Sequence, residues 1–246
     1  MRNTSYYPKD NRLADFTMEV YPIFLNRLNT NKTVLIGGNE EAERKANELL
    51  RAGANLTIIS KHITSVMMDW KNSDEITWIK REYRDGDLKD AYMVIVAEYE
   101  GTINEKVWQE ANRLGILCNV MDDIPHCNFT FGSLVKRGPL NIAVSTSGAA
   151  PALAVRIREG FEKEFGLEYE DFLDFMQSIR QRMKQIHPHF TKRKAVWYEL
   201  IDSEVLELFR QGLFHKAKKL AEEIIHNPSG SPQTKINTVS EEKQWN

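Results

Sequence analysis

The stretch TVLIGGNEEA, residues 33–42, decides the fold of this chain of 246 residues. Its apolar beginning predicts a buried strand over residues 33–37, and a helix with one apolar face is expected over residues 40–52. The glycine pair between them permits a tight turn and brings the N–H groups of the helix N-terminus to the end of the strand. Such strand–turn–helix elements hold the pyrophosphate of a dinucleotide, and they also occur as plain turns without a ligand.

Strand and helix patterns continue to alternate downstream. Further strands are expected over residues 55–60, 76–81, 92–97 and 116–121, and a further helix over residues 102–114. Strands that alternate with helices assemble into a parallel sheet with right-handed crossover connections. The first part of the chain is therefore predicted to be a Rossmann-type α/β unit.

The pattern changes in the second half of the chain. Two strands, residues 129–136 and 140–145, flank the turn Arg137-Gly138-Pro139. A helical pattern then runs from residue 150 almost to 226, with interruptions that we expect at Pro188 and residues 190–194. Two strands are too few for an independent sheet domain, so we expect this β segment to pair with a second copy of the chain.

The predicted fold class is thus α/β: a Rossmann-type parallel sheet, then a small β dimerisation segment, then a helical C-terminal domain. Both ends of the chain are polar and are expected to be disordered. The predicted divisions are a disordered extension 1–19, an NAD-binding Rossmann domain 20–118, a β dimerisation segment 119–149, a helical domain 150–226 and a disordered tail 227–246.

Composition restricts the class of protein. The net charge is −2 at pH 7, whereas nucleic-acid binding usually needs a basic surface. Cys118 and Cys127 are the only cysteines, too few for a disulfide framework, so a reducing compartment is expected. No apolar run approaches the roughly 18 residues of a membrane span, and the N-terminus lacks the apolar core of a signal peptide. We therefore expect a soluble cytoplasmic protein without a nucleic-acid or membrane partner.

The glycine turn departs from the usual dinucleotide pattern G-x-G-x-x-G/A. Gly37 and Ala42 fit this pattern, but Asn39 replaces the middle glycine; asparagine tolerates a left-handed backbone better than most residues. The acidic residue that usually binds the ribose about 20 positions later is missing, and Lys61 lies near that place instead. A lysine there is typical of an NADP site or of a solvated surface, so the spacing alone does not choose the cofactor.

Seven segments in order resemble one known family, the precorrin-2 dehydrogenase/sirohydrochlorin ferrochelatase family, which includes the N-terminal half of bacterial siroheme synthase. The resemblance covers about residues 20–210 and rests on YPIFL (21–25), AERKA (42–46), GANLT (53–57), NVMDD (119–123), CNF (127–129), RGPL (137–140) and STSGAAP (145–151). The chain departs from the family at Asn39, at Gly132, which replaces a proline, at Thr146, where many members have serine, and at Glu98-Tyr99-Glu100, where Thr-Asp-Asp is usual.

The resemblance implies that the protein is a homodimeric enzyme that oxidises precorrin-2 to sirohydrochlorin with NAD. Two alternatives stay open: a bifunctional enzyme that also inserts Fe²⁺ or Co²⁺, and a non-catalytic tetrapyrrole- or nucleotide-binding protein, which Asn39 and residues 98–100 favour. The cofactor is expected to contact Gly37, Gly38, Asn39, Glu40, Glu41, Lys61, His62, Ala97 and Thr102.

Asp122 matches the key aspartate of the family and is the expected catalytic base. An aspartate just after a strand is also typical of a turn or a helix cap, and Asp123 is a weaker candidate. His126 is a candidate substrate contact, because a neutral imidazole acts as a base or transient metal ligand near neutral pH; an ordinary loop histidine is the alternative.

Small hydroxyl residues precede the helical part. Ser145, Thr146 and Ser147 are expected to bind a substrate carboxylate at a helix N-terminus, or simply to cap that helix. His187 and His189 are interpreted as surface-loop residues, because no other residues with metal-ligand spacing accompany them. No resident metal is expected.

Overall fold

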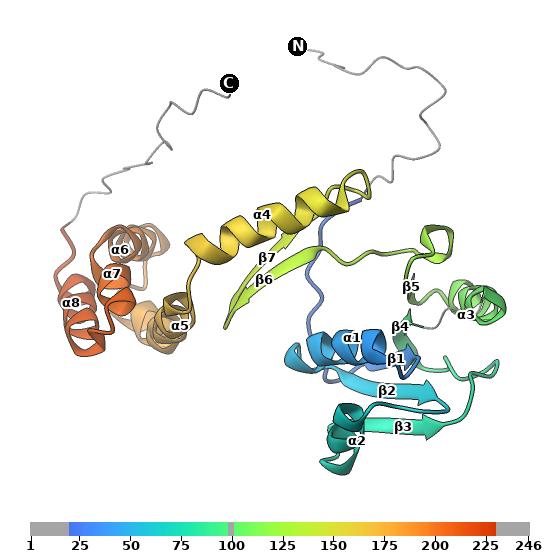
Figure 1. Cartoon of the computed structure of the whole chain (residues 1–246). Helices are drawn as coiled ribbons and strands as arrows, with labels where there is room; N and C mark the ends of the chain where they lie inside the picture. Colours follow the sequence, from blue (N-terminus) through green and yellow to red (C-terminus); the bar gives the residue numbers. More distant parts are fainter. Residues whose placement is uncertain (1–19, 98–100, 230–246) are drawn as a thin grey trace, which may run out of the picture. The chain divides into compact units, whose positions relative to one another are not determined.

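A computed structural model describes residues 20–97 and 101–229 (Figure 1). Within these ranges the chain divides into two compact units, residues 20–131 and residues 132–229. No helix in the described ranges is long and apolar enough to cross a membrane.

The first unit is built on a parallel sheet of five strands in the order β3-β2-β1-β4-β5. The strand order reverses between β1 and β4, so the loops that follow these two strands diverge and leave a place for a ligand at the carboxyl edge. The elements are β1 (Lys32–Ile36), α1 (Glu40–Arg51), β2 (Asn55–Ser60), α2 (Ser65–Asn72), β3 (Ile76–Lys80), β4 (Ala91–Val96), α3 (Gly101–Leu114) and β5 (Leu117–Val120).

Helices cover both faces of this sheet (Figure 1). On one face Leu35 of β1 packs in a cluster with Ala46 of α1 and Met67 of α2. On the other face Val34 packs in a cluster with Val107 of α3. Because neighbouring residues of β1 point to opposite faces and both faces are buried, the strand is apolar throughout, as expected of a central parallel strand.

The predicted strands and helices of this unit are confirmed to within two residues at each end, but α2 was missed. Only Met67 of this eight-residue helix is buried, so no apolar periodicity marks it in the sequence. The helix starts at a local cap, in which the Thr64 hydroxyl accepts a hydrogen bond of 3.2 Å from the Met67 N–H.

The first unit continues past β5 to Phe131. The Cys118 N–H donates to the side-chain oxygen of Asn128 at 2.7 Å, and the Asn128 N–H donates to the Cys118 carbonyl at 3.0 Å. These bonds hold the segment after β5 against the sheet, so the compact unit extends beyond residue 118, where the sequence analysis ended the Rossmann domain.

The second unit begins with an antiparallel strand pair, β6 (Ser133–Arg137) and β7 (Leu140–Val144). The predicted turn between them is confirmed, with Gly138 in the left-handed region at φ 54°. The first of these strands begins at Ser133, four residues later than predicted, because Phe129 packs against the core of the first unit. The Arg137 guanidinium donates to the Phe165 carbonyl at 2.9 Å and so fixes the pair to the end of the following helix.

Five helices complete the second unit (Figure 1): α4 (Pro151–Glu164), α5 (Glu168–Ile186), α6 (Phe190–Asp202), α7 (Val205–Arg210) and α8 (Phe214–His226). The predicted interruption at residues 190–194 was wrong, because these residues form the first turn of α6. The surface-loop interpretation of His187 was also wrong. Its ring is buried, and its Nε2 lies 2.7 Å from the Ile225 carbonyl, which links the end of α5 to α8.

Gly38 is the position where the β1–α1 turn leaves least space. A methyl group there would lie 1.7 Å from the His62 carbonyl oxygen, so Gly38→Ala is expected to lower the free energy of unfolding by about 2 kcal/mol. Gly160→Ala is the control, because that helical site faces open space and the change should stabilise by about 0.5–1 kcal/mol. Thermal unfolding measures both. Equal stability of Gly38→Ala and the wild type would contradict this close approach.

Candidate functional site

Two glycines form the centre of the carboxyl edge of the sheet. Gly37 has φ 125°, and its N–H donates to the Ile59 carbonyl at 3.1 Å. A methyl group on Gly37 would lie 2.8 Å from the carbonyl oxygen of Ala97. The turn after β1 therefore packs directly on the ends of β2 and β4, and its surface is backbone rather than side chain.

Asn39 caps α1. Its side-chain oxygen accepts from the Ala42 N–H at 2.9 Å, and its side-chain nitrogen donates to the Ala97 carbonyl at 3.2 Å. Its backbone is extended, with φ −82° and ψ −179°, so the left-handed tolerance that the sequence analysis invoked is not used. The carboxamide instead takes one of the N–H groups that a middle glycine would leave to a phosphate.

Three carboxylates lie in the first turn of α1, those of Glu40, Glu41 and Glu43. They stabilise the helix through its macrodipole. The same charges oppose a phosphate at this end of the helix, so the backbone N–H groups must supply the attraction for any pyrophosphate there.

The end of β2 carries the next two predicted cofactor contacts. The Lys61 ammonium forms an ion pair with Glu82, and the hydrogen bond from Lys61 lowers the pKa of the Glu82 carboxyl. The His62 side chain is exposed, and its carbonyl accepts a hydrogen bond of 2.6 Å from the Ser60 hydroxyl. Lys61 therefore faces a carboxylate, a poor arrangement for a 2′-phosphate.

The remaining predicted cofactor contacts flank the segment after β4. Ala97 is buried at the end of that strand, and Thr102 is exposed in the first turn of α3. Glu98-Tyr99-Glu100 lies outside the described residues.

The sequence analysis did not single out Asn104. Its side chain is buried in the first turns of α3, and its Oδ1 has no hydrogen-bond partner in the described structure. The signal was present in the sequence, because Asn104 falls in register with the buried Val107 and Ala111 on the face of α3 that packs on the sheet. A buried acceptor without a partner is unusual and is suited to a polar group of a bound molecule.

Asp122 follows β5 in a turn and has a left-handed backbone at φ 59°. Its side chain is exposed, and within residues 20–97 and 101–229 its carboxylate forms no hydrogen bond or ion pair. The helix-cap interpretation of Asp122 therefore finds no support in the described contacts. The carboxylate stays available to accept a proton.

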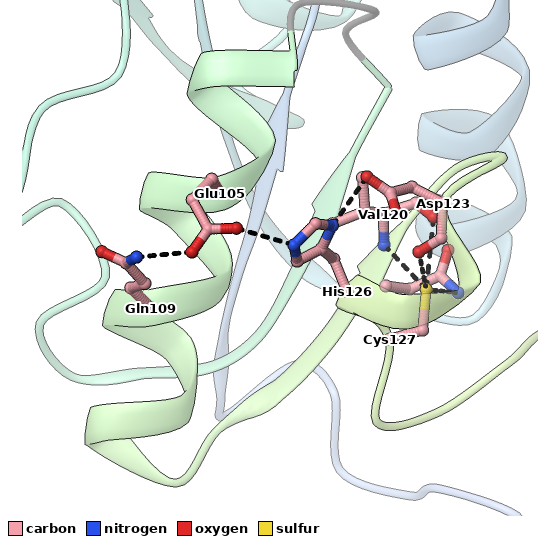
Figure 2. Close-up of polar contacts among 7 residues, drawn as sticks. Glu105, Gln109, Val120, Asp123, His126 and Cys127 are labelled. Carbon is pink, nitrogen blue, oxygen red and sulfur yellow. Dashed lines mark hydrogen bonds and ion pairs between the residues drawn. The ribbon is translucent and has the colours of Figure 1, made fainter.

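His126 bridges two carboxylates (Figure 2). Its Nδ1 lies 2.7 Å from Asp123 Oδ2, and its Nε2 lies 2.8 Å from Glu105 Oε2. The hydrogen bond with Asp123, followed by that with Glu105, raises the pKa of His126 above its ordinary value. Because both ring nitrogens are engaged, the expected roles of neutral base or metal ligand do not match this geometry.

The Cys127 thiol is engaged by the backbone around it. Its Sγ accepts from the Val120 N–H at 3.2 Å, and burial raises the pKa of the thiol. Within the described ranges, no group of three or more His, Cys, Asp and Glu side chains lies together in a way that could hold a metal ion.

The three predicted substrate contacts of the second unit form the turn before α4. The Thr146 hydroxyl accepts from the Ala150 N–H at 3.1 Å, and the Ser145 hydroxyl accepts from the Ser147 N–H at 3.1 Å. Ser147 has φ 52°, in the left-handed region. These hydroxyls thus shape the turn that leads into α4. The N-cap of the helix is Ala150 and no side chain caps it, so the capping interpretation was wrong.

Comparison with known families accounts for most of the described chain. Three family models match it in order: "Putative NAD(P)-binding" over residues 24–133, "Sirohaem biosynthesis protein central" over 137–164 and "Sirohaem synthase dimerisation region" over 168–225. Two of the three models are named for sirohaem biosynthesis, so the chain resembles siroheme synthases over most of its length. The resemblance drawn from the sequence motifs is confirmed. The dimerisation model falls on α5 to α8, whereas the sequence analysis assigned dimerisation to residues 119–149.

Individual relatives agree with this assignment. The chain is 30% identical to a siroheme synthase of Pseudoalteromonas translucida over 222 residues, which are 90% of this chain and 46% of that protein. It is 32% identical to a siroheme synthase of Photorhabdus laumondii over 206 residues, 84% of this chain and 44% of that protein. The chain thus spans about half the length of the curated relatives it matches.

A solved structure has the same fold. The protein described as "SirC, precorrin-2 dehydrogenase" superposes with a TM-score of 0.65 at 20% sequence identity, over 81% of this chain and 100% of that one. This likeness confirms the predicted architecture of a Rossmann-type sheet, a small strand pair and a helical C-terminal region.

The role of Asn39 leads to a prediction with two variants. Asn39→Ala removes the cap and should cost about 1 kcal/mol of stability, whereas Asn39→Gly should cost only a few tenths of a kcal/mol. Asn39→Gly also removes the carboxamide from the helix N-terminus, so it should bind NAD more tightly than the wild type. Thermal unfolding and calorimetric titration with NAD test the two parts. Weaker NAD binding by Asn39→Gly would indicate that the carboxamide is itself a ligand of the cofactor.

Proposed function

We propose that this chain oxidises precorrin-2 to sirohydrochlorin with NAD as the hydride acceptor. The observation that carries the proposal is that two features lie at the same edge of the sheet. The glycine turn after β1 and the unpaired carboxylate of Asp122 after β5 both lie at the carboxyl ends of parallel strands, where α/β proteins bind their ligands. The likeness to siroheme synthases supports the class of substrate.

The residues of this edge fit a nicotinamide cofactor. Gly37 and Gly38 leave the turn without side chains, and the N-terminus of α1 follows it directly. Asn104 contributes a buried acceptor in the first turns of α3. When bound, the cofactor supplies the hydride acceptor; these residues bind and orient it.

The preference for NAD over NADP rests on Lys61. Lys61 is the lysine that follows β2, and its ion pair with Glu82 places a carboxylate beside its ammonium group. The Glu82 carboxylate would repel a 2′-phosphate at this place, whereas it would not repel the uncharged ribose hydroxyl of NAD.

Asp122 is proposed to accept the proton that leaves the macrocycle as the hydride departs. Its exposed carboxylate has no competing partner in the described structure, so it can approach a flat substrate. Within the second unit, Ser145, Thr146 and Ser147 precede α4 and are proposed to bind a carboxylate. A helix N-terminus and small hydroxyl groups favour an anion.

The function is tested by incubating the purified protein anaerobically with precorrin-2 and NAD, without metal, and following the absorbance change to sirohydrochlorin. Asp122→Asn should lower kcat by about 100-fold or more, the usual contribution of a general base. Asp74→Asn is the matched control, because Asp74 is also exposed and left-handed, with φ 59°. A folded wild-type protein that turns over with neither NAD nor NADP would refute the proposal and favour a non-catalytic binder.

We also propose a homodimer that includes α5 to α8, the elements matched by the dimerisation model. The two-stranded sheet of β6 and β7 leaves both of its strands at an edge, and pairing with a second copy would satisfy these backbone groups. Light scattering at micromolar concentration should give twice the chain mass of 28.5 kDa. A monomer at that concentration would exclude a stable homodimer.

A further inference from the structure

We propose that Glu105 and Asp123 are positioning residues, which hold a positively charged His126 between them and thereby fix the turn that carries Asp122. We call the three side chains the His126 clamp. The effect of the clamp on catalysis rests on the proposed function. The clamp itself is a property of the fold and can be measured without turnover.

The clamp joins two elements that are distant in sequence. Glu105 lies in the second turn of α3, while Asp123 and His126 lie at the two ends of the short 3₁₀ turn η1 (Ile124–His126) (Figure 2). The ring of His126 is 2.7 Å from one carboxylate and 2.8 Å from the other. No other hydrogen bond between side chains joins α3 to η1 within the described ranges.

Only the protonated ring can satisfy both contacts. Imidazolium carries an N–H on each nitrogen, whereas neutral imidazole carries one and would turn a lone pair towards the second carboxylate. Among the described residues, the charged groups that face the ring are Asp123 on its own turn and Glu105 on α3. Trp108, also on α3, is an uncharged neighbour whose ring is tilted by 67° to that of His126, with the two ring centroids 6.1 Å apart. The raised pKa of His126 agrees with this geometry.

The backbone carries the effect of the clamp to Asp122. The Asp123 N–H donates to the Val120 carbonyl at 3.2 Å, and the His126 N–H donates to the Asp123 carbonyl at 3.0 Å. Asp122 lies between Val120 and Asp123 in a left-handed conformation, and its side chain forms no hydrogen bond or ion pair with the described residues that would fix it. The position of its carboxylate relative to α3, which carries Thr102 and Asn104, therefore depends on the clamp.

The direction of the pH effect follows from the raised pKa of His126. A histidine whose pKa is higher in the folded protein stabilises the fold fully below its unfolded pKa, and that stabilisation is lost as the pH rises through the folded value. The clamp should therefore be closed in mildly acidic solution and open in alkaline solution, where one carboxylate loses its donor.

The first experiment is an NMR titration of the histidine ring resonances in the full chain. His126 is assigned by its loss in His126→Arg, and the other histidines serve as internal references. The pKa of His126 should be above the ordinary histidine value in the wild type and should fall in Glu105→Gln, which keeps the shape but removes one charge. Asp85→Asn, which removes an ion pair at the other end of α3, should leave it unchanged. A wild-type value at or below the ordinary one, or no change in Glu105→Gln, would overturn the clamp.

The second experiment compares pH profiles of precorrin-2 oxidation. We expect kcat to fall at alkaline pH, and the midpoint of this alkaline limb should equal the pKa of His126. In Glu105→Gln the limb should move to lower pH, while KM for NAD stays unchanged. His126→Arg supplies a cation that does not titrate in this range, so the alkaline limb should disappear. A limb that stays in place in both variants would refute the positioning role. Absence of turnover in every variant would refute the proposed function and leave the NMR result standing.

Discussion

The close packing of the β1–α1 turn against its neighbouring strands is the constraint on which the rest of the structure depends. Gly37 and Gly38 carry no side chain, and any side chain there would collide with the carbonyl groups of Ala97 or His62. This packing fixes the ends of β1, β2 and β4 relative to one another. It also places the N-terminus of α1 over the point where the strand order reverses, which is the proposed cofactor site.

Negative charge is the second feature that shapes this site. Carboxylates of α1 surround the helix N-terminus, and Glu82 pairs with Lys61 at the end of β2. Asp122 and Asp123 add two more beyond β5. His126 lies between Asp123 and Glu105 and offsets part of this charge when its ring is protonated. Asp122 has no described partner, and it is the carboxylate proposed to act as base.

Much of this account could be predicted from the sequence because it depends on local patterns. Apolar runs bounded by glycine predicted the parallel strands, and the family motifs placed Asp122 at the end of β5. The sequence could not predict contacts between distant segments. Glu105 and His126 are 21 positions apart, so nothing in the spacing indicated that they meet. His187 was misplaced for the same reason, since its partner Ile225 is 38 positions away. The short helix α2 has a single buried residue, so its sequence shows no apolar periodicity from which it could be predicted.

The central claim is that a nicotinamide cofactor binds at the glycine turn, and backbone amide NMR tests it most directly. The account predicts that NAD shifts the amide resonances of Gly37 and Gly38 saturably. Gly86 and Gly115, which precede β4 and β5 at the opposite edge of the sheet, should not move. Saturable NAD binding that leaves the resonances of Gly37 and Gly38 unchanged would contradict the account.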